Sequence, residues 1–190
     1  MQGAASRRFA SLAFAIGTFL SSLGAASAAS DPRACATNPY LPYDRPLGLT
    51  METLDGPRFD LTQERGKPVV LTMFATWCEA CQEELPELVA AQKHYAGLGL
   101  HVVLIDVREP DNTVRRYRDR NAITLPIAMD RDGTITRAIQ LGGGHGTVYY
   151  PTMLLIGRDG RIACYTQTGL DASTLDAQIA HVLAAPAPSP

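Results

Sequence analysis

The sequence predicts an α/β domain, in which a central mixed sheet has helices on both faces and is preceded by an N-terminal hairpin and arm. Three observations lead to this expectation. Residues 67–75 form a nearly continuous apolar run, which is typical of a strand buried on both faces. Leu85, Leu88 and Val89 then recur at helical spacing. Further strand and helix patterns alternate until a hairpin and a last helix, an order typical of a sheet covered by helices.

The elements are expected in the following order. Weak strand signals at 49–53 and 58–61 flank Asp55-Gly56, a pair typical of hairpin turns. Between buried strands at 67–75 and 100–107 lies a helix at 78–96, which Pro86 should kink. The second half predicts a helix at 112–121, a strand at 126–129, a helix at 134–140, strands at 152–156 and 161–167 joined by an Arg158-Asp159-Gly160 turn, and a last helix at 171–183 capped by Asp171 or Ser173.

The first 28 residues have the composition of an export signal. Arg7 and Arg8 precede an apolar stretch at 9–23, and Ala26-Ser27-Ala28 fits a cleavage site between small residues. Two alternatives stay open: an uncleaved anchor, since 9–29 is about long enough to span a bilayer, and a buried first helix. We expect a periplasmic or other extracytoplasmic location, with membrane contact only through an uncleaved leader.

One domain is expected after the leader. Residues 29–46 contain four prolines and predict an irregular arm, 47–185 hold the domain, and 186–190 predict a disordered tail. The chain of 190 residues is 46% hydrophobic and has a net charge of −2, which suits a globular protein with a buried core. No basic stripe is present, so nucleic-acid binding is excluded. We expect a monomer.

Cys78 and Cys81 form a C-x-x-C motif. Disulfide exchange needs one thiolate that attacks and a second thiol that resolves the mixed disulfide. A helix that starts at Cys78 would bring the two sulfurs within bonding distance, and its dipole would stabilise the Cys78 thiolate. Cys81, one turn further along, should be more buried. Export favours this interpretation, because disulfides persist outside the cytoplasm.

The same motif can form half of a zinc site. However, the sequence contains no second C-x-x-C and no H-x-x-H, and the motif lies between a predicted strand and a predicted helix with Trp77 before it. We therefore predict a redox-active pair, with no metal and no cofactor.

Four stretches resemble a known family: Lys67-Pro68-Val69-Val70-Leu71, Phe74-Ala75-Thr76-Trp77-Cys78-Glu79-Ala80-Cys81, Glu84-Leu85-Pro86-Glu87-Leu88 and Tyr150-Pro151-Thr152. From about Phe59 to the last helix the chain resembles the thioredoxin-like family, in its exported TlpA/ResA/cytochrome-c-maturation branch. The resemblance implies a thioredoxin fold with a central helical insertion, which matches the helix expected at 112–121. It also implies reduction of partner-protein disulfides, typically in cytochrome c maturation or in assembly of oxidase copper centres.

Glu84 stands one helical turn after Cys81 and should face the dithiol. A partly desolvated carboxyl there can shuttle a proton to or from the buried thiol. Cytosolic thioredoxins use a buried Asp on the preceding strand, where this sequence has Thr72, so Glu84 resembles the substitute of the exported branch. The alternative is an ordinary solvated glutamate, as expected for Glu83 and Glu87.

The resemblance also implies a substrate groove formed by Trp77, Tyr150, Pro151 and Thr152. The matching proline of the family is cis and faces the dithiol, where the exposed backbone pairs with an extended substrate segment; a trans loop proline is the alternative. Tyr150 is bulkier than the residue usual before that proline and should narrow the groove. The glycine-rich residues 142–146 are expected to form a mobile lip of the groove.

Cys35 and Cys164 admit three interpretations. They can form a structural disulfide that pins the arm to a late strand, as some members of this branch do, or remain two free buried thiols, or exchange with another partner. A bridge would close a loop of about 130 residues, worth up to roughly 4–5 kcal/mol in the chain-entropy model.

Several functional alternatives stay open. The leading prediction is a reductase, re-reduced by a membrane thiol donor, but Glu79 opposes the helix dipole at Cys78, and the direction of electron flow depends on a potential that the sequence does not reveal. The rival is a copper metallochaperone that uses Cys78, Cys81 and His145 as ligands. The block Arg115-Arg116-Tyr117-Arg118-Asp119-Arg120 predicts a solvated helix face or a docking patch for an acidic partner.

Overall fold

The computed structural model of the chain describes residues 35–36, 38–140, 148–167 and 171–185. β3 (Val69–Phe74) is the central strand of a five-stranded sheet with the order β5-β4-β3-β6-β7, and all six of its residues are buried. β4 (His101–Val107) is parallel to β3, and β5 (Ile127–Asp130) is parallel to β4. β6 (Thr152–Ile156) and β7 (Ile162–Thr166) are each antiparallel to the strand before them in the sheet. The predicted mixed sheet is confirmed.

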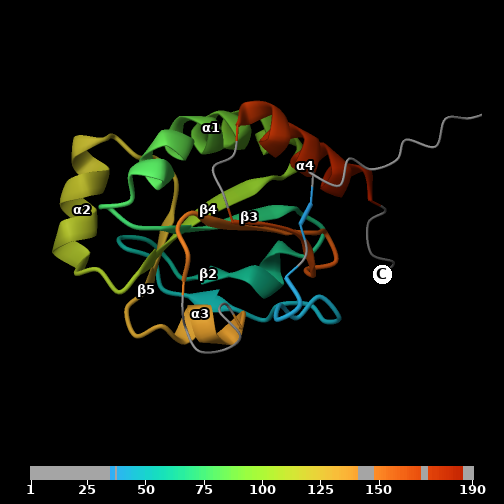
Figure 1. The fold of residues 1–190 in the computed structure, drawn as a ribbon, viewed down its shortest axis with the longest axis horizontal. Helices are drawn as coiled ribbons and strands as arrows, with labels where there is room; N and C mark the ends of the chain where they lie inside the picture. Colours follow the sequence, from blue (N-terminus) through green and yellow to red (C-terminus); the bar gives the residue numbers. More distant parts are fainter. Residues whose placement is uncertain (1–34, 37, 141–147, 168–170, 186–190) are drawn as a thin grey trace, which may run out of the picture.

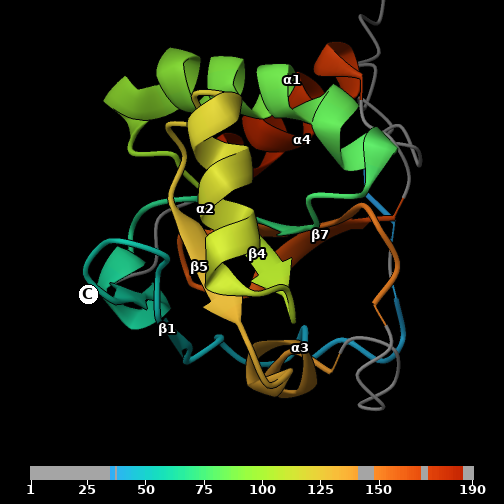
Figure 2. The same cartoon turned by 90° about the vertical axis from the view of Figure 1, so that its left-hand side faces the viewer.

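Helices cover both faces of this sheet, as predicted. α1 (Glu79–Tyr95) and α4 (Ala172–Ala184) lie side by side across one face (Figure 1). α3 (Thr134–Ala138) lies on the opposite face. α2 (Asp111–Arg120), the expected central insertion, stands at the β5 edge, which Figure 2 presents to the viewer. The helices and strands after residue 67 begin and end within two residues of their predicted bounds.

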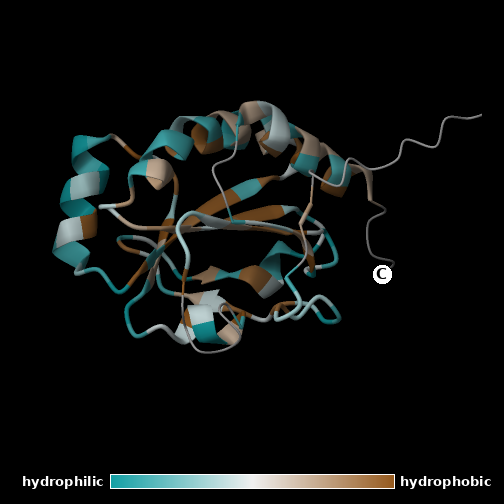
Figure 3. Cartoon of the chain, viewed as in Figure 1, coloured by the Kyte–Doolittle hydropathy of each residue, from teal (hydrophilic) through white to brown (hydrophobic). Residues whose placement is uncertain are grey.

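The core consists of two apolar layers, one on each face of the sheet. Val70 and Phe74 of β3 pack in the layer that contains Leu88 of α1, whereas Leu71 and Met73 pack in the opposite layer. This alternation follows from the two-residue period of a strand. Figure 3 shows the strands of the sheet as mainly apolar and α2 as mainly hydrophilic.

The predicted N-terminal hairpin is present but is shorter and more open than expected. β1 (Thr50–Met51) pairs with β2 (Phe59–Asp60), followed by a 3-10 turn, η1 (Leu61–Glu64); another, η2 (Ala96–Leu98), follows α1. Asp55-Gly56 does not close a two-residue turn. The chain after β1 instead runs along β5, where the Leu54 N–H donates to the Ile127 carbonyl at 2.8 Å, so pairing with the sheet edge widens the hairpin.

The described part of the arm packs on the β7 side of the domain. The Ala36 N–H donates to the Tyr165 carbonyl at 3.2 Å, and Leu41 and Leu47 are buried. The predicted leader, 1–28, and the predicted tail, 186–190, lie outside the described residues. Within the described ranges, no helix combines the length and the apolar composition that crossing a bilayer requires.

Candidate active site

Cys78 is the N-cap residue directly before α1, and it forms a disulfide with Cys81. The two Cα atoms are 5.2 Å apart, and the Cys81 N–H donates to Cys78 Sγ at 3.1 Å. Both residues are buried, with 6% of Cys78 and 4% of Cys81 exposed, so the expected difference in burial is small. A sulfur at this position faces the free N–H groups of the first helical turn, which favour a negatively charged group.

The segment before Cys78 is held by a residue that the sequence analysis did not identify. Glu109, just after β4, accepts hydrogen bonds from the Thr76 N–H at 2.6 Å and from Thr76 Oγ1 at 2.7 Å. The Thr76 carbonyl accepts a third bond from Gln82 Nε2 of α1 at 3.0 Å. The polar groups of Thr76, two residues before Cys78, are therefore all engaged.

Asp106 on β4 adds a second carboxyl to this region. It is fully buried, at 0% exposed, and its Oδ1 accepts a hydrogen bond from the Glu109 N–H at 3.1 Å. Burial, together with the adjacent Glu109 carboxylate, raises the pKa of Asp106 to about 8. The sequence analysis did not single out Asp106, although a charged residue inside an apolar strand run is a signal that could have identified it.

Tyr150 is partly buried, and the charges of the two carboxyls act on it. Burial, followed by the negative charge of Asp106 and Glu109, raises the pKa of Tyr150 to about 12. Its ring meets Trp77 edge-on, with the centroids 5.1 Å apart. Trp77 itself is 66% exposed, and Tyr149 is 60% exposed. We call Trp77, Tyr149 and Tyr150 the aromatic surface; its Trp77 directly precedes Cys78 of the disulfide.

The Tyr150–Pro151 peptide bond is cis, which is the isomer that the family resemblance implies. Thr152 opens β6, and its Oγ1 donates to the Tyr149 carbonyl at 2.7 Å. Since Thr152 pairs with Met73 on β3, the start of β6 lies at the same edge of the sheet as the segment leading to Cys78. The structure thus brings Trp77, Tyr150, Pro151 and Thr152 together with the cysteine pair.

Glu84 is only 6% exposed and belongs to the buried side of α1, together with Cys81, Leu85 and Leu88. Glu83, its neighbour, is exposed. Thr72 of β3 is buried as well. The alternative of a solvated Glu84 is therefore wrong, because the turn after Cys81 faces the sheet.

Cys35 is bonded to Cys164, which is fully buried on β7, and the sequence separation between them is 129 residues. His145 and the glycine-rich residues 142–146 lie outside the described residues. Among the residues that the structure does describe, no group of three or more His, Cys, Asp or Glu side chains is arranged to hold a metal ion.

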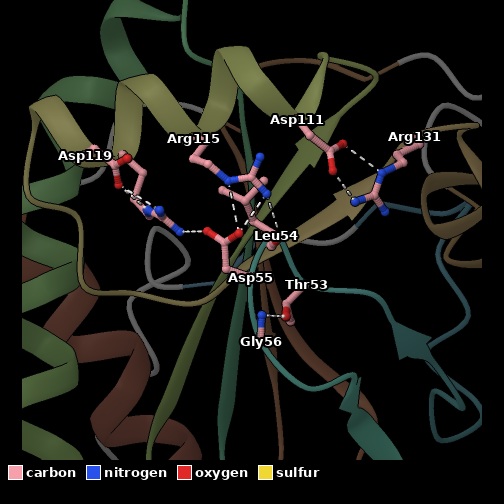
Figure 4. A network of polar contacts seen from close by, with 9 residues as sticks. Thr53, Leu54, Asp55, Gly56, Asp111, Arg115, Asp119 and Arg131 are labelled. Atoms are coloured by element: carbon pink, nitrogen blue, oxygen red, sulfur yellow. Dashed lines mark hydrogen bonds and ion pairs between the residues drawn. The ribbon is translucent and has the colours of Figure 1, made fainter.

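The arginine block is only partly a solvated face. Arg115 Nε and Nη2 donate to Asp55 Oδ1 at 3.0 and 2.7 Å, and Arg118 also pairs with Asp55 (Figure 4). These bonds tie α2 to the loop between β1 and β2. Arg116, Asp119 and Arg120 are exposed, so the prediction of a solvated face holds for these three residues of the block.

The comparisons with known proteins agree with this geometry. Residues 45–164 match the AhpC/TSA family. The thiol-disulfide oxidoreductase ResA of Geobacillus thermodenitrificans is 30% identical over 114 residues, covering 60% of this chain and 62% of that protein. ResA of Bacillus subtilis is 28% identical over 114 residues, covering 60% of each chain. The chain thus spans about 60% of the length of these curated relatives.

Solved structures extend the similarity to most of the domain. The crystal structure of a thiol:disulfide interchange protein of the thioredoxin family from Chlorobium tepidum superposes with a TM-score of 0.64 at 28% identity. The superposition covers 73% of this chain and 97% of the Chlorobium chain.

Proposed function

Because this chain belongs to the AhpC/TSA family, in the thioredoxin-like branch that contains the ResA proteins, we propose that it is an exported thiol–disulfide oxidoreductase that reduces disulfides in other proteins. One observation carries the proposal. The Cys78–Cys81 disulfide lies at the N-terminus of α1, beside a cis proline and an exposed tryptophan. Exchange requires a reversible disulfide whose attacking sulfur is stabilised as a thiolate and which a partner can approach.

The reaction starts from the dithiol form. The Cys78 thiolate attacks one sulfur of a partner disulfide, forms a mixed disulfide and releases the other partner sulfur as a thiolate, which takes up a proton. Cys81 then loses its proton and attacks Cys78 Sγ, which re-forms the Cys78–Cys81 bond and releases the second partner thiol. Two electrons and two protons pass to the partner in total, and the protein is left oxidised.

Glu84 is assigned the proton transfer at Cys81. The buried thiol has to lose its proton before it resolves the mixed disulfide, and a buried carboxyl on the next turn of α1 is a suitable acceptor. The exposed Glu83 on the same helix cannot serve this role, because it faces solvent.

Partner binding is assigned to Trp77, Tyr150, Pro151 and Thr152. An extended partner segment would pair with the backbone next to Pro151 and pack on the aromatic surface. Because the Tyr150 ring packs against Trp77, the groove should favour a restricted set of partners.

We propose the setting from the composition of the leader and from the family resemblance. We assign residues 1–28 to export or anchoring, 29–46 to the arm, 47–185 to the domain and 186–190 to the tail. The protein would act as a monomer without a cofactor, on partner proteins of cytochrome c maturation or oxidase copper-centre assembly. A membrane thiol donor must re-reduce it, since the compartment is oxidising.

Trapping in the native host tests the proposal. In Cys81→Ala the mixed disulfide on Cys78 has no internal thiol to resolve it, so partner proteins should accumulate as adducts that dithiothreitol releases. The Cys78→Ala/Cys81→Ala double variant is the matched control and should capture none. An empty trap, together with a Cys78–Cys81 pair that stays bridged in every glutathione buffer, would contradict the proposed function.

A further inference from the structure

Burying the Asp106 carboxyl lowers the stability of the folded protein, so a functional role for this residue is worth examining. It lies within β4, pairs in register with Phe74 and is completely buried. Its Oδ1 accepts one hydrogen bond from Glu109, but Oδ2 is buried without a partner among the residues that the structure describes. An ionised carboxylate in such a place is strongly destabilised, because burial shields Oδ2 from solvent and no described residue donates a hydrogen bond to it.

Glu109, unlike Asp106, has a hydrogen-bond donor at each of its carboxylate oxygens. Both of its carboxylate oxygens accept short hydrogen bonds from Thr76, at 2.6 and 2.7 Å. Both oxygens therefore act as acceptors, which commits the Glu109 carboxyl to Thr76. The negative charge of Glu109, and to a smaller extent that of Asp111, acts on Asp106. Because Asp106 is completely buried and Glu109 is committed to Thr76, a single proton shared by the pair belongs mainly on Asp106. The charges of Arg108 and Asp130 also act on Tyr150, the residue that interacts with both carboxyls.

We propose that Asp106 and Glu109 are a proton-sharing pair that positions Thr76, and through Thr76 holds Trp77 and Cys78 in place for disulfide exchange. With the proton on Asp106, Glu109 is the only charged member of the pair and keeps both Thr76 bonds. When the proton leaves, two carboxylates stand side by side in a buried site. Their repulsion drives Glu109 away from Asp106, and the bonds to Thr76 weaken.

The positioning role rests on the proposed exchange activity, but the pair itself is testable without it. Trp77 is the single tryptophan of the chain and follows Thr76 directly. In the oxidised protein Cys78 and Cys81 cannot titrate, and the pKa of Tyr150, about 12, lies far above the range of interest. The emission of Trp77 in the bridged protein therefore reports on the carboxyl pair.

The experiment is a fluorescence titration of the oxidised full chain from pH 5 to pH 10. The intact protein should show a transition in Trp77 emission and anisotropy near the pKa of Asp106, about 8. Asp106→Asn should abolish it, because the amide donates to Glu109 at every pH. Glu109→Gln should move it to lower pH, since the neighbouring negative charge is gone. The control Asp111→Asn, whose side chain is paired with Arg131 at the start of α2, should keep it.

A transition that persists unchanged in both Asp106→Asn and Glu109→Gln, or that is missing from the intact protein, would overturn the proposal.

The kinetic readout is the rate at which reduced protein reacts with glutathione disulfide. It should stop rising above about pH 8 in the intact protein and should keep rising with the Cys78 thiolate in Asp106→Asn. Absence of any reaction with glutathione disulfide would count against the proposed function, while leaving the optical test of the pair intact.

Discussion

The backbone N–H of Cys81 points at the sulfur of Cys78, with 3.1 Å between nitrogen and Sγ. In the reduced protein the same N–H would face a thiolate, together with the other free N–H groups at the start of α1. Glu79, the first residue of the helix, is exposed and places a carboxylate beside that sulfur.

The first prediction follows from this pair of opposing charges. Cys78 should react with iodoacetamide well before Cys81, although the two side chains are almost equally buried, because only Cys78 lies at the helix terminus. Glu79→Gln should raise the Cys78 rate at pH 7 about twofold, as expected for removal of one exposed charge worth about 0.4 kcal/mol. Glu83→Gln, further along the same helix, is the control, and an equal effect there would contradict the local explanation. Mass spectrometry of the quenched reaction measures both sites.

The second prediction concerns stability and pH. Asp106 has a pKa of about 8 in the folded protein and an ordinary pKa near 3.8 when unfolded. The folded state therefore holds a proton that the unfolded state has lost, and the stabilisation from that proton is complete below about pH 4 and disappears as pH rises through 8. The free energy of unfolding should fall between pH 5 and pH 9, on the order of a few kcal/mol. Asp106→Asn should flatten this dependence in urea titrations at pH 5, 7 and 9, and parallel curves for the two proteins would contradict the assignment.

The third prediction concerns the second disulfide, which we propose to be structural. Cys35–Cys164 ties the arm to β7 across 129 residues, far from the exchanging pair in sequence. Cys35→Ala should lower the free energy of unfolding by about 2–5 kcal/mol, since a long loop of the unfolded chain is no longer closed. The reaction of reduced Cys78 with glutathione disulfide should keep its rate. A large loss of exchange with little loss of stability would point to a redox role for this bridge instead.

The fold was largely predictable because its strongest signals are local. The six buried residues of β3 form one nearly continuous apolar run in the sequence. The spacing of Leu85 and Leu88 indicates the helical period of α1. The turn between β1 and β2 was predicted too tightly, since the Asp55-Gly56 pair carries no information about distant partners. Arg115 and Arg118 draw Asp55 into ion pairs about 60 residues away, and the chain pairs with β5 instead of closing at once.

The site was predictable only where the chemistry lies within one segment. Cys78, Cys81 and Glu84 follow from the helix period, and Pro151 follows from the family resemblance. Glu109 was missed, although parallel strands place their carboxyl ends at one edge of the sheet, which brings the residues after β4 close to those after β3. Only the three-dimensional register shows that Glu109 binds Thr76, because nothing in the sequence links residues 33 positions apart.

The fourth prediction tests Glu84. If it moves the proton of Cys81, Glu84→Gln should slow resolution of the mixed disulfide by about 10²-fold or more, the usual contribution of a positioned acid–base group. Formation of the mixed disulfide by Cys78 should be much less affected, since that step does not use the Cys81 proton. Quenched-flow separation of the two steps measures the split. Glu83→Gln is the matched control on the solvent side of the same helix, and an even loss in both steps would indicate a packing defect instead.

The last prediction concerns partner choice. The Tyr150 ring meets Trp77 edge-on, with the centroids 5.1 Å apart, and it is partly buried against the core, which limits its movement. Tyr150→Val removes the ring but keeps a side chain compatible with the extended backbone before Pro151. The groove should then accept bulkier partner segments. The test is a competition among disulfide peptides that differ in the residue next to the cysteine. The reduction rate of peptides with a small residue there, divided by that of peptides with an aromatic residue, should move toward one.

Tyr149→Val is the matched control for this change. Tyr149 is 60% exposed and precedes Tyr150 directly, so its removal takes away a similar apolar area from the aromatic surface without opening the space between Trp77 and Pro151. It should weaken binding of all peptides alike and leave the ratio of rates unchanged. If both variants shift the ratio of rates equally, the selectivity arises from nonspecific apolar contact with the aromatic surface. A shift in Tyr150→Val alone assigns the selectivity to the width of the groove, because of the two tyrosines it is Tyr150 whose ring packs against Trp77.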